Sequence, residues 1–158
     1  LRGEERGRPV PVEALPQVRS RVGVDLAPPD LRTEEGVRLL KAFVWAGQEQ
    51  RLADLDAAIE VWRRDPPEIV VGDLVDELPG LLGRRRDDAV LLVWETAAFG
   101  YLPEERRERA RALLTAAECV FVHTGRPSDG SPDHYGLYVD GDEVAHAEFH
   151  GAWIEWLE

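Results

Sequence analysis

The sequence predicts a doubly wound α/β fold, with a mainly parallel sheet that ends in an antiparallel hairpin. Short apolar runs alternate along the chain with stretches of helical spacing, which is the pattern of strand–helix–strand units. Near the C-terminal end, the dipeptide Asp140-Gly141 separates two apolar segments, as in a hairpin with a two-residue turn. With 158 residues and a hydrophobic content of 44%, the chain is expected to form one domain.

The first half of the chain contains two expected strands with a long helical stretch between them. An apolar run at residues 22–26 predicts a strand, which ends at a pair of prolines. Thr33 precedes two glutamates and predicts a helix start, because its hydroxyl caps free N–H groups and acids favour the positive end of the helix dipole. Apolar residues recur at helical spacing as far as Trp62, with a break expected at Gly47. Residues 69–71 predict the second strand.

The second half continues the alternation and then changes to antiparallel strands. Its third strand is apolar at successive positions, as expected where helices cover both faces of a parallel sheet. Closing such a sheet with a hairpin is characteristic of the methyltransferase variant of the Rossmann-like fold. The elements are expected at residues 76–82 (helix), 90–94 (strand), 103–114 (helix), 119–122 (strand), and 135–139 and 143–149 (hairpin).

The domain organisation predicted from these elements is incomplete. Residues 1–20 contain three prolines, which remove hydrogen-bond donors from a sheet, and we interpret them as a linker or a loop remnant. Residues 21–158 are interpreted as the C-terminal part of a single methyltransferase-like domain whose first, central strand has no counterpart. The chain also lacks a methionine at position 1. The strands beginning near Val22 and Val90 are therefore expected to face each other across a gap or to pair directly.

Composition limits the partners and the compartment. The net charge of −12 argues against binding to a phosphate backbone, so we expect no nucleic-acid partner. No apolar run approaches the roughly 18 residues needed to span a bilayer, and no membrane partner is expected. The single Cys119 excludes a disulfide framework and favours a reducing compartment, which predicts a cytoplasmic location. Nothing in the sequence indicates the oligomeric state.

Acidic residues at the ends of two predicted parallel strands are the first candidates for a binding site. In doubly wound sheets, ligands bind beyond the carboxyl ends of the strands. Asp25 at such an end is suited to accept hydrogen bonds from the two hydroxyls of a ribose. Gly72 would let the backbone approach a ring closely, while Asp73 takes an amino group. The alternative is that these residues are ordinary turn and helix-capping residues.

Two residues near the third strand are candidates for catalysis. Glu95 ends that strand, where burial would raise the pKa of a carboxylate and suit it to act as a general base. Tyr101 is placed to hydrogen-bond in the same cleft. The alternatives are a solvated acid at the strand end and a packed aromatic side chain before the following helix.

The residues His146, Glu148 and His150 alternate along the last expected strand. Positions two apart share a face of a strand, and imidazole and carboxylate groups suit zinc or iron. A polar stripe on an edge hairpin is common, however, and the sequence offers no fourth ligand, so we expect no metal here. We expect His150 instead to position residues 151–156, where a helical turn would place Trp153 and Trp156 on one face. Neither a nucleophile-elbow motif nor a phosphate-binding glycine loop is present.

Several stretches, taken together and in order, resemble the bacterial family called domain of unknown function 2332. The resemblance covers about residues 19 to 157. The stretches are Arg21 to Pro28, Val44-Trp45 with Gln48 and Arg51, Gly72-Asp73-Leu74 with Leu78-Pro79, Gly100-Tyr101-Leu102, and His150 to Leu157.

The resemblance implies a class I S-adenosylmethionine-dependent methyltransferase fold. It places Asp25 where methyltransferases bind the ribose of the cofactor and Asp73 where they bind the adenine amino group. Leu26, Gly72 and Leu74 fall in the same implied cofactor site. After the third strand the family typically has a His-Ser pair, whereas this sequence has Glu95-Thr96.

Three functions are compatible with these observations. The leading hypothesis is a methyltransferase-like protein that binds S-adenosylmethionine, with a substrate that the sequence does not identify. The second is a non-catalytic Rossmann-like module that binds a nucleotide or a partner protein. The third is a nicotinamide-dependent oxidoreductase, because an acidic strand end also binds the ribose of that cofactor.

Overall fold

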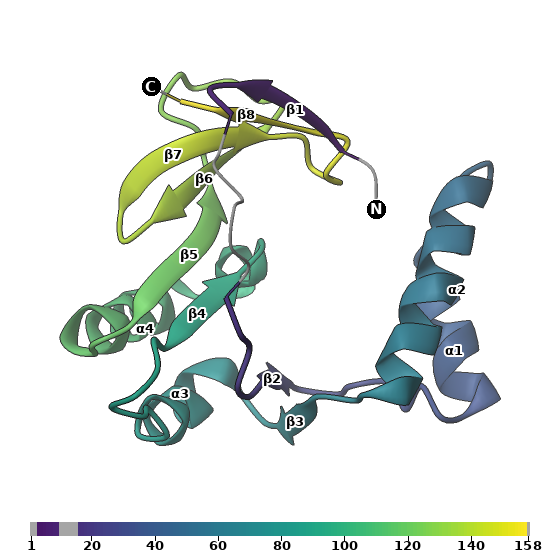
Figure 1. The fold of residues 1–158 in the computed structure, drawn as a ribbon, viewed down its shortest axis with the longest axis horizontal. Coiled ribbons are helices and arrows are strands. Elements are labelled where there is room, and N and C mark those ends of the chain that lie inside the picture. Colours follow the sequence, from purple (N-terminus) through teal and green to yellow (C-terminus); the bar gives the residue numbers. More distant parts are fainter. Residues whose placement is uncertain (1–2, 10–15, 158) are drawn as a thin grey trace. The chain divides into compact units, whose positions relative to one another are not determined.

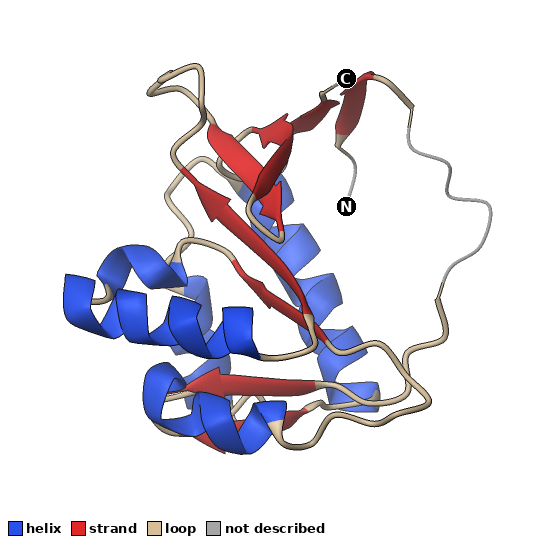
Figure 2. Cartoon of the chain, turned by 90° about the vertical axis from the view of Figure 1, so that its left-hand side faces the viewer, coloured by secondary structure: helices blue, strands red, loops and turns tan. Residues whose placement is uncertain are grey.

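The computed structural model describes residues 3–9 and 16–157, and the chain divides into two compact units. Unit 1 comprises residues 1–17 and 78–158, and unit 2 comprises residues 18–77. Figure 2 distinguishes the helices from the strands of both units.

Unit 2 contains a two-stranded parallel sheet and two helices that connect its strands. Strand β2 (Val22–Asp25) pairs with β3 (Glu68–Val71), from Val22 opposite Glu68 to Asp25 opposite Val71. Parallel strands need a crossover connection, and α1 (Glu34–Lys41) and α2 (Glu49–Arg64) supply it. Helix α3 (Leu74–Leu82) follows β3 and continues into unit 1.

Local signals in the sequence set the ends of these helices. The Thr33 side chain accepts a hydrogen bond from the Gly36 N–H at 3.1 Å, which confirms it as the N-cap of α1. Gly47 has a φ of +85°, a conformation that favours glycine, and lies between α1 and α2. The predicted break of the helical stretch is therefore confirmed.

Unit 1 contains a six-stranded mixed sheet (Figure 1). Its strand order is β1-β8-β7-β6-β5-β4, and β1 pairs with β8 in parallel, as does β4 with β5. The pairs β5–β6, β6–β7 and β7–β8 are antiparallel, because short loops join these consecutive strands. The strands are β1 (Glu4–Gly7), β4 (Leu92–Glu95), β5 (Val120–Gly125), β6 (Tyr135–Val139), β7 (Asp142–Ala147) and β8 (Trp153–Trp156).

The turn between β6 and β7 confirms the hairpin expected at Asp140-Gly141. Asp140 has a φ of +52° and Gly141 a φ of +97°, as the two central residues of a type I′ turn require. The register of the hairpin then shifts by one residue between Leu137 and Tyr138, which marks a β-bulge.

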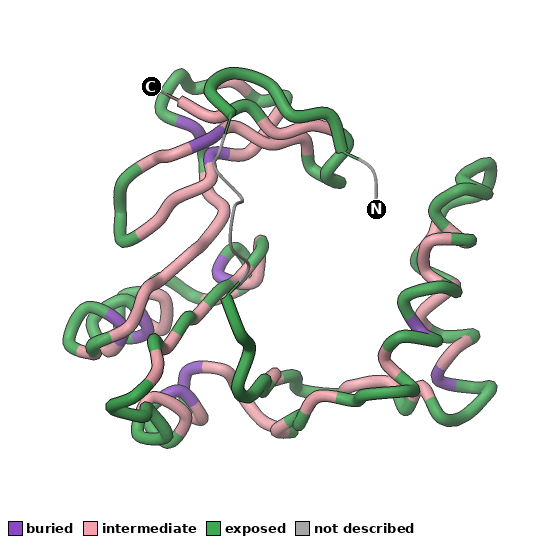
Figure 3. Tube along the Cα trace, in the orientation of Figure 1, coloured by how far each residue is buried: buried purple, intermediate pink, exposed green. Residues whose placement is uncertain are grey.

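The helical elements of unit 1 contribute much of its buried hydrophobic surface. Besides the end of α3, they are the short 3-10 helix η1 (Ala98–Tyr101) and α4 (Glu104–Ala116). Figure 3 shows how sparse the buried residues are along the chain. In the described part of unit 1 the buried hydrophobic residues are Leu78, Phe99, Ala110, Leu114 and Ala145, and in unit 2 they are Ile59 and Val75.

The predicted doubly wound, mainly parallel sheet is wrong, and with it the Rossmann-like methyltransferase topology. Strands β2 and β4 neither pair nor share a sheet, and the larger sheet is mostly antiparallel. The alternation of apolar and helical segments is real, but it does not specify which sheet each strand joins.

Two further differences concern the ends of the chain. Residues 4–7, within the segment interpreted as a linker, form β1, which pairs with β8. Residues 153–156 form β8 rather than a helical turn. On a strand, residues three apart point to opposite faces, so Trp153 and Trp156 do not share the face that was expected.

The strand expected to be the most buried is exposed on one face. In β4, Leu92 and Trp94 lie two residues apart and share a face, and their exposed fractions are 51% and 72%. A run of apolar residues therefore does not imply helices on both faces here. Within the described ranges, no helix combines the length and the apolar character needed to cross a membrane.

Candidate functional site

The loop between β5 and β6, residues 126–134, is fixed by two side chains of the β6–β7 hairpin. The Tyr138 hydroxyl donates a hydrogen bond to the carbonyl oxygen of Arg126 at 2.6 Å. The Glu143 carboxylate accepts the backbone N–H of Ser128, with nitrogen–oxygen distances of 3.1 and 3.2 Å. These bonds join segments that are 12 and 15 residues apart in sequence, so the hairpin holds the loop in one conformation.

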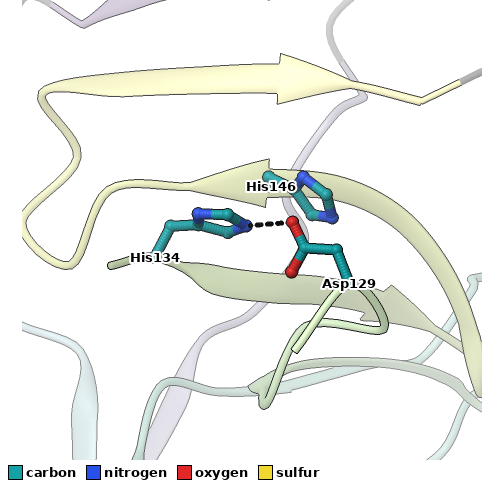
Figure 4. Close-up of side chains that lie close together, drawn as sticks. All are labelled: Asp129, His134 and His146. Atoms are coloured by element: carbon teal, nitrogen blue, oxygen red, sulfur yellow. Dashed lines mark ion pairs between the residues drawn. The ribbon is translucent and has the colours of Figure 1, made fainter. Parts of the chain in front are cut away.

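Asp129, in this loop, lies beside two histidines (Figure 4). The distance from Asp129 Oδ2 to His134 Nε2 is 3.3 Å, and the ring centroids of His134 and His146 are 4.4 Å apart. One ligand atom from each of the three residues lies within 4.8 Å of the other two. Asp129, His134 and His146 are called the Asp-His-His cluster below.

Both imidazoles of the cluster are largely buried, and each has a ring nitrogen without a hydrogen-bond partner. The exposed fraction of each side chain is 13%. Both Nε2 atoms are shielded from solvent, and neither has a neighbour in hydrogen-bond geometry, although each lies within ion-pair distance of a carboxylate, Asp129 for His134 and Glu143 for His146. The edge of the His134 ring also packs against Trp153, with centroids 5.7 Å apart. Buried polar atoms normally form hydrogen bonds, so the lack of one at both nitrogens indicates that a bound group could pair with them.

The β-bulge brings the two histidines to the same face of the hairpin. In a regular register from the turn, where Val139 faces Asp142, His146 would face Tyr135. The one-residue shift makes it face Gly136 instead. Because side chains alternate along a strand, His146 then shares the face of His134, which immediately precedes β6.

Hydrogen bonds keep the carboxylates around the cluster ionised. The backbone N–H of Ser131 donates to Asp129 Oδ1 at 2.8 Å and lowers the pKa of Asp129, and the neighbouring imidazoles lower it further. Burial raises the pKa of Glu143, but the hydrogen bonds from Ser128 and Tyr138 and the neighbouring His146 imidazole outweigh it and lower the pKa below its ordinary value. The distance from Glu143 Oε1 to His146 Nε2 is 3.5 Å.

The residues of the Asp-His-His cluster fit a transition-metal ion. Zinc binds histidine nitrogen and aspartate oxygen at about 2.0–2.2 Å, and a tetrahedral arrangement then separates ligand atoms by roughly 3.3 Å. The Asp129–His134 distance of 3.3 Å matches this separation. Two imidazoles and one carboxylate form a donor set that suits zinc or iron(II).

His146, Glu148 and His150, which were considered as metal ligands in the sequence analysis, do not form a cluster of ligand atoms. Of these, only His146 belongs to the Asp-His-His cluster. Glu148 Oε2 accepts the backbone N–H groups of His150 and Ala152, at 2.8 and 3.1 Å, and so stabilises the turn before β8. Sequence reasoning missed Asp129 and His134, because a regular hairpin would put His134 and His146 on opposite faces.

The proposed cofactor residues gather at the carboxyl ends of the two strands of unit 2. The Gly72 N–H donates a hydrogen bond to the Asp25 carbonyl oxygen at 3.0 Å, which joins the loops after β2 and β3. Leu26 follows Asp25 and is 71% exposed, and Leu74 is the first residue of α3.

The carboxylates at these strand ends make local hydrogen bonds. Asp25 Oδ1 accepts the Ala27 N–H at 2.8 Å. Asp73 Oδ1 accepts the N–H groups of Val75 and Asp76, at 2.8 and 3.4 Å, and so caps the start of α3. Asp25 and Asp73 therefore have the turn and helix-capping roles that the sequence analysis gave as alternatives to ligand binding.

Unit 2 also has a surface hollow, but it lies at the opposite ends of the strands. Its volume is about 480 Å³, and its lining residues precede β2 and β3 or begin β3. They are Val18, Arg19, Ser20, Arg21, Asp65, Pro66, Pro67 and Glu68. Arg21 and Asp65 form an ion pair in this hollow.

The two proposed catalytic residues differ in environment. Glu95 Oε2 accepts the Phe99 N–H at 3.1 Å, whereas Oε1 is buried without a hydrogen-bond partner. Tyr101, at the end of η1, is 89% exposed. Glu95 therefore stabilises the turn that leads into η1, and Tyr101 is not a packed aromatic.

Comparison with known proteins gives a family and no closer relative. The family model described as "Uncharacterized protein conserved in bacteria (DUF2332)" matches residues 1–156. The chain therefore belongs to this family. No curated protein and no solved structure matches the chain.

Proposed function

We propose that this member of the DUF2332 family binds a divalent transition-metal ion through Asp129, His134 and His146. One observation carries the proposal: three ligand atoms of the right chemistry converge within 4.8 Å of one another. The shielding of both Nε2 atoms from solvent supports it, because a bound ion would satisfy them.

The donor set favours zinc or iron(II) over calcium or magnesium. Calcium and magnesium take oxygen ligands and keep six or more of them, whereas imidazole nitrogen is the preferred ligand of zinc and iron. Three protein ligands also leave one position of a tetrahedral ion open for water or a substrate. Open sites of this kind occur in zinc enzymes, whereas structural zinc sites use four protein ligands.

Zinc titration calorimetry of the metal-free protein tests the proposal. We expect one zinc ion per chain for the unaltered protein, and loss of that ion in His134→Ala and in His146→Ala. His150→Ala is the matched control, because it removes an exposed imidazole outside the Asp-His-His cluster. Zinc binding that is equally strong in all four proteins would overturn the proposal.

A second candidate function is binding of an adenosine-containing ligand, such as S-adenosylmethionine, by unit 2. It is supported by the Gly72–Asp25 hydrogen bond, which joins two acidic strand ends at the edge where parallel sheets bind ligands. Calorimetry against S-adenosylmethionine and NAD tests it. We expect Asp25→Ala to weaken binding of the preferred ligand by about 1.5–3 kcal/mol, as for a lost charged hydrogen bond. Unchanged affinity in both Asp25→Ala and Asp73→Ala would exclude this site.

A further inference from the structure

A hollow in unit 1 adjoins the Asp-His-His cluster. Its volume is about 390 Å³, which lies within the range of small-molecule sites. His134 belongs both to the cluster and to the lining of the hollow. The lining residues are Gly125, Arg126, Pro127, Gly130, Ser131, Pro132, His134, Tyr135 and Phe149.

Most of the exposed surface that lines this hollow is apolar. Pro127 and Pro132 come from the loop that also carries Asp129. The rings of Tyr135 and Phe149 meet edge to face, with centroids 4.6 Å apart and an interplanar angle of 81°. Prolines and paired aromatic rings form a rigid wall, which suits an apolar ligand body.

Arg126 supplies a cation to the same hollow. Among the described residues, no carboxylate forms an ion pair with its guanidinium. Other arginines of unit 1 are paired, for example Arg107 with Glu104. A guanidinium binds a carboxylate through two parallel hydrogen bonds. A metal ion at the cluster would add a second positive charge beside the hollow and outweigh the charge of Asp129.

We propose that this hollow binds a small carboxylic acid with an aromatic body. The ring lies against Tyr135 and Phe149, and the carboxylate faces Arg126 and the metal ion. The inference rests on the proposed metal site, because the metal supplies part of the positive charge. Metal and acid therefore strengthen each other's binding by the same factor.

The test uses benzoate as the probe and benzyl alcohol as its neutral counterpart, in NMR chemical-shift titrations of the zinc-loaded protein. We expect benzoate to bind at least about tenfold more tightly than benzyl alcohol, as for a hydrogen-bonded charge. Arg126→Gln should reduce this preference to the part that the metal ion supplies, and Arg109→Gln, an exposed arginine of α4, should keep it in full. Phe149→Ala should weaken both probes alike, because both use the aromatic wall.

The metal site is tested separately, by titrating zinc into the same variants without benzoate. Arg126→Gln should bind zinc normally, since its side chain is not part of the Asp-His-His cluster. If zinc binds but benzoate and benzyl alcohol bind equally, or if Arg126→Gln keeps the preference undiminished, the inference is overturned and the metal site stands. If zinc does not bind to the unaltered protein, the metal site and the inference both fall.

Discussion

The β5–β6 loop of unit 1 and the strand ends of unit 2 both present aspartates beyond a strand, yet those aspartates meet different partners. Asp25 and Asp73 accept hydrogen bonds from backbone N–H groups two or three residues further along the chain. Asp129 makes one such bond, to Ser131, but its other oxygen faces His134. Hydrogen bonds across 12 and 15 residues thus hold the loop that carries Asp129, whereas bonds within three residues orient the carboxylates of Asp25 and Asp73.

The largest effect that would separate the two regions is the pH dependence of zinc binding. Histidine changes its charge between pH 5 and 8, and only neutral imidazole binds a metal ion. We expect zinc affinity to fall as the pH is lowered, by up to about 100-fold per pH unit, because protons compete with the metal ion for two imidazoles. Asp129, whose pKa is lowered, stays ionised over this range. Zinc calorimetry at several pH values would measure the slope, and a flat profile would exclude two histidine ligands.

The next effect concerns Glu143, which anchors the loop and is only 9% exposed. We expect Glu143→Ala to cost about 1.5–3 kcal/mol of unfolding free energy at pH 7, because it removes the charged acceptor of Ser128. Zinc affinity should fall about 10–100-fold, as for other outer-shell partners. Urea unfolding and zinc titration measure the two effects.

The destabilisation by Glu143→Ala should itself depend on pH. The pKa of Glu143 is lowered in the folded protein, so its contribution is complete above the ordinary value of 4.5 and is lost as the pH falls through the lowered value. The variant and the unaltered protein should therefore converge in stability at acidic pH. Glu108→Ala, an exposed glutamate of α4, is the control. A difference in unfolding free energy that persists at low pH would contradict the role given to the charge of the Glu143 carboxylate.

A smaller effect is expected from the N-cap of α3 in unit 2. Asp73→Ala removes the acceptor of the Val75 and Asp76 N–H groups and should cost about 0.5–2 kcal/mol of unfolding free energy. Zinc affinity should not change, since Asp73 lies outside the cluster. Thermal unfolding and zinc calorimetry of the same sample would show this, and altered zinc binding would contradict the assignment of the two regions.

The smallest effect is expected from Tyr138→Phe, which removes only a hydroxyl. Its hydrogen bond to the neutral Arg126 carbonyl is short, at 2.6 Å, and its contact with the Glu143 carboxylate is longer, at 3.3 Å, so the loss should be about 0.5–1.5 kcal/mol. The ring stacks on His123 with centroids 4.9 Å apart, and phenylalanine keeps that contact. Hydrogen exchange should show faster opening of residues 126–134, and unchanged exchange there would argue against the anchoring role.

Features that depend only on residues adjacent in the sequence were predictable from it. Thr33 caps α1, Gly47 separates α1 from α2, and Asp140-Gly141 forms the hairpin turn. Each of these features arises from the conformational preference of one or two residues. Gly72-Asp73 likewise follows a parallel strand, as the sequence indicated, but the helix after it begins at Leu74 rather than at the expected residue 76.

Features that depend on strand pairing were not predictable. The apolar runs at β2 and β4 look alike in sequence, and nothing local assigns them to different sheets. The Asp-His-His cluster depends on a bulge at Leu137 and Tyr138, which changes the face of every later residue of β7. In the sequence, Asp129 and His134 are loop residues with no visible relation to His146. Only the register of the β6–β7 pair shows that the three side chains lie together.

X-ray absorption at the zinc edge, measured on the protein loaded with one equivalent of zinc, tests the metal site most directly. The structure predicts two imidazole nitrogens and oxygen ligands at about 2.0–2.2 Å, with no sulfur. In His134→Ala and His146→Ala the imidazole signal should fall to one ring or the zinc should be lost, whereas His150→Ala should match the unaltered protein. A shell with sulfur from Cys119, or a spectrum that the substitutions at positions 134 and 146 leave unchanged, would contradict the account.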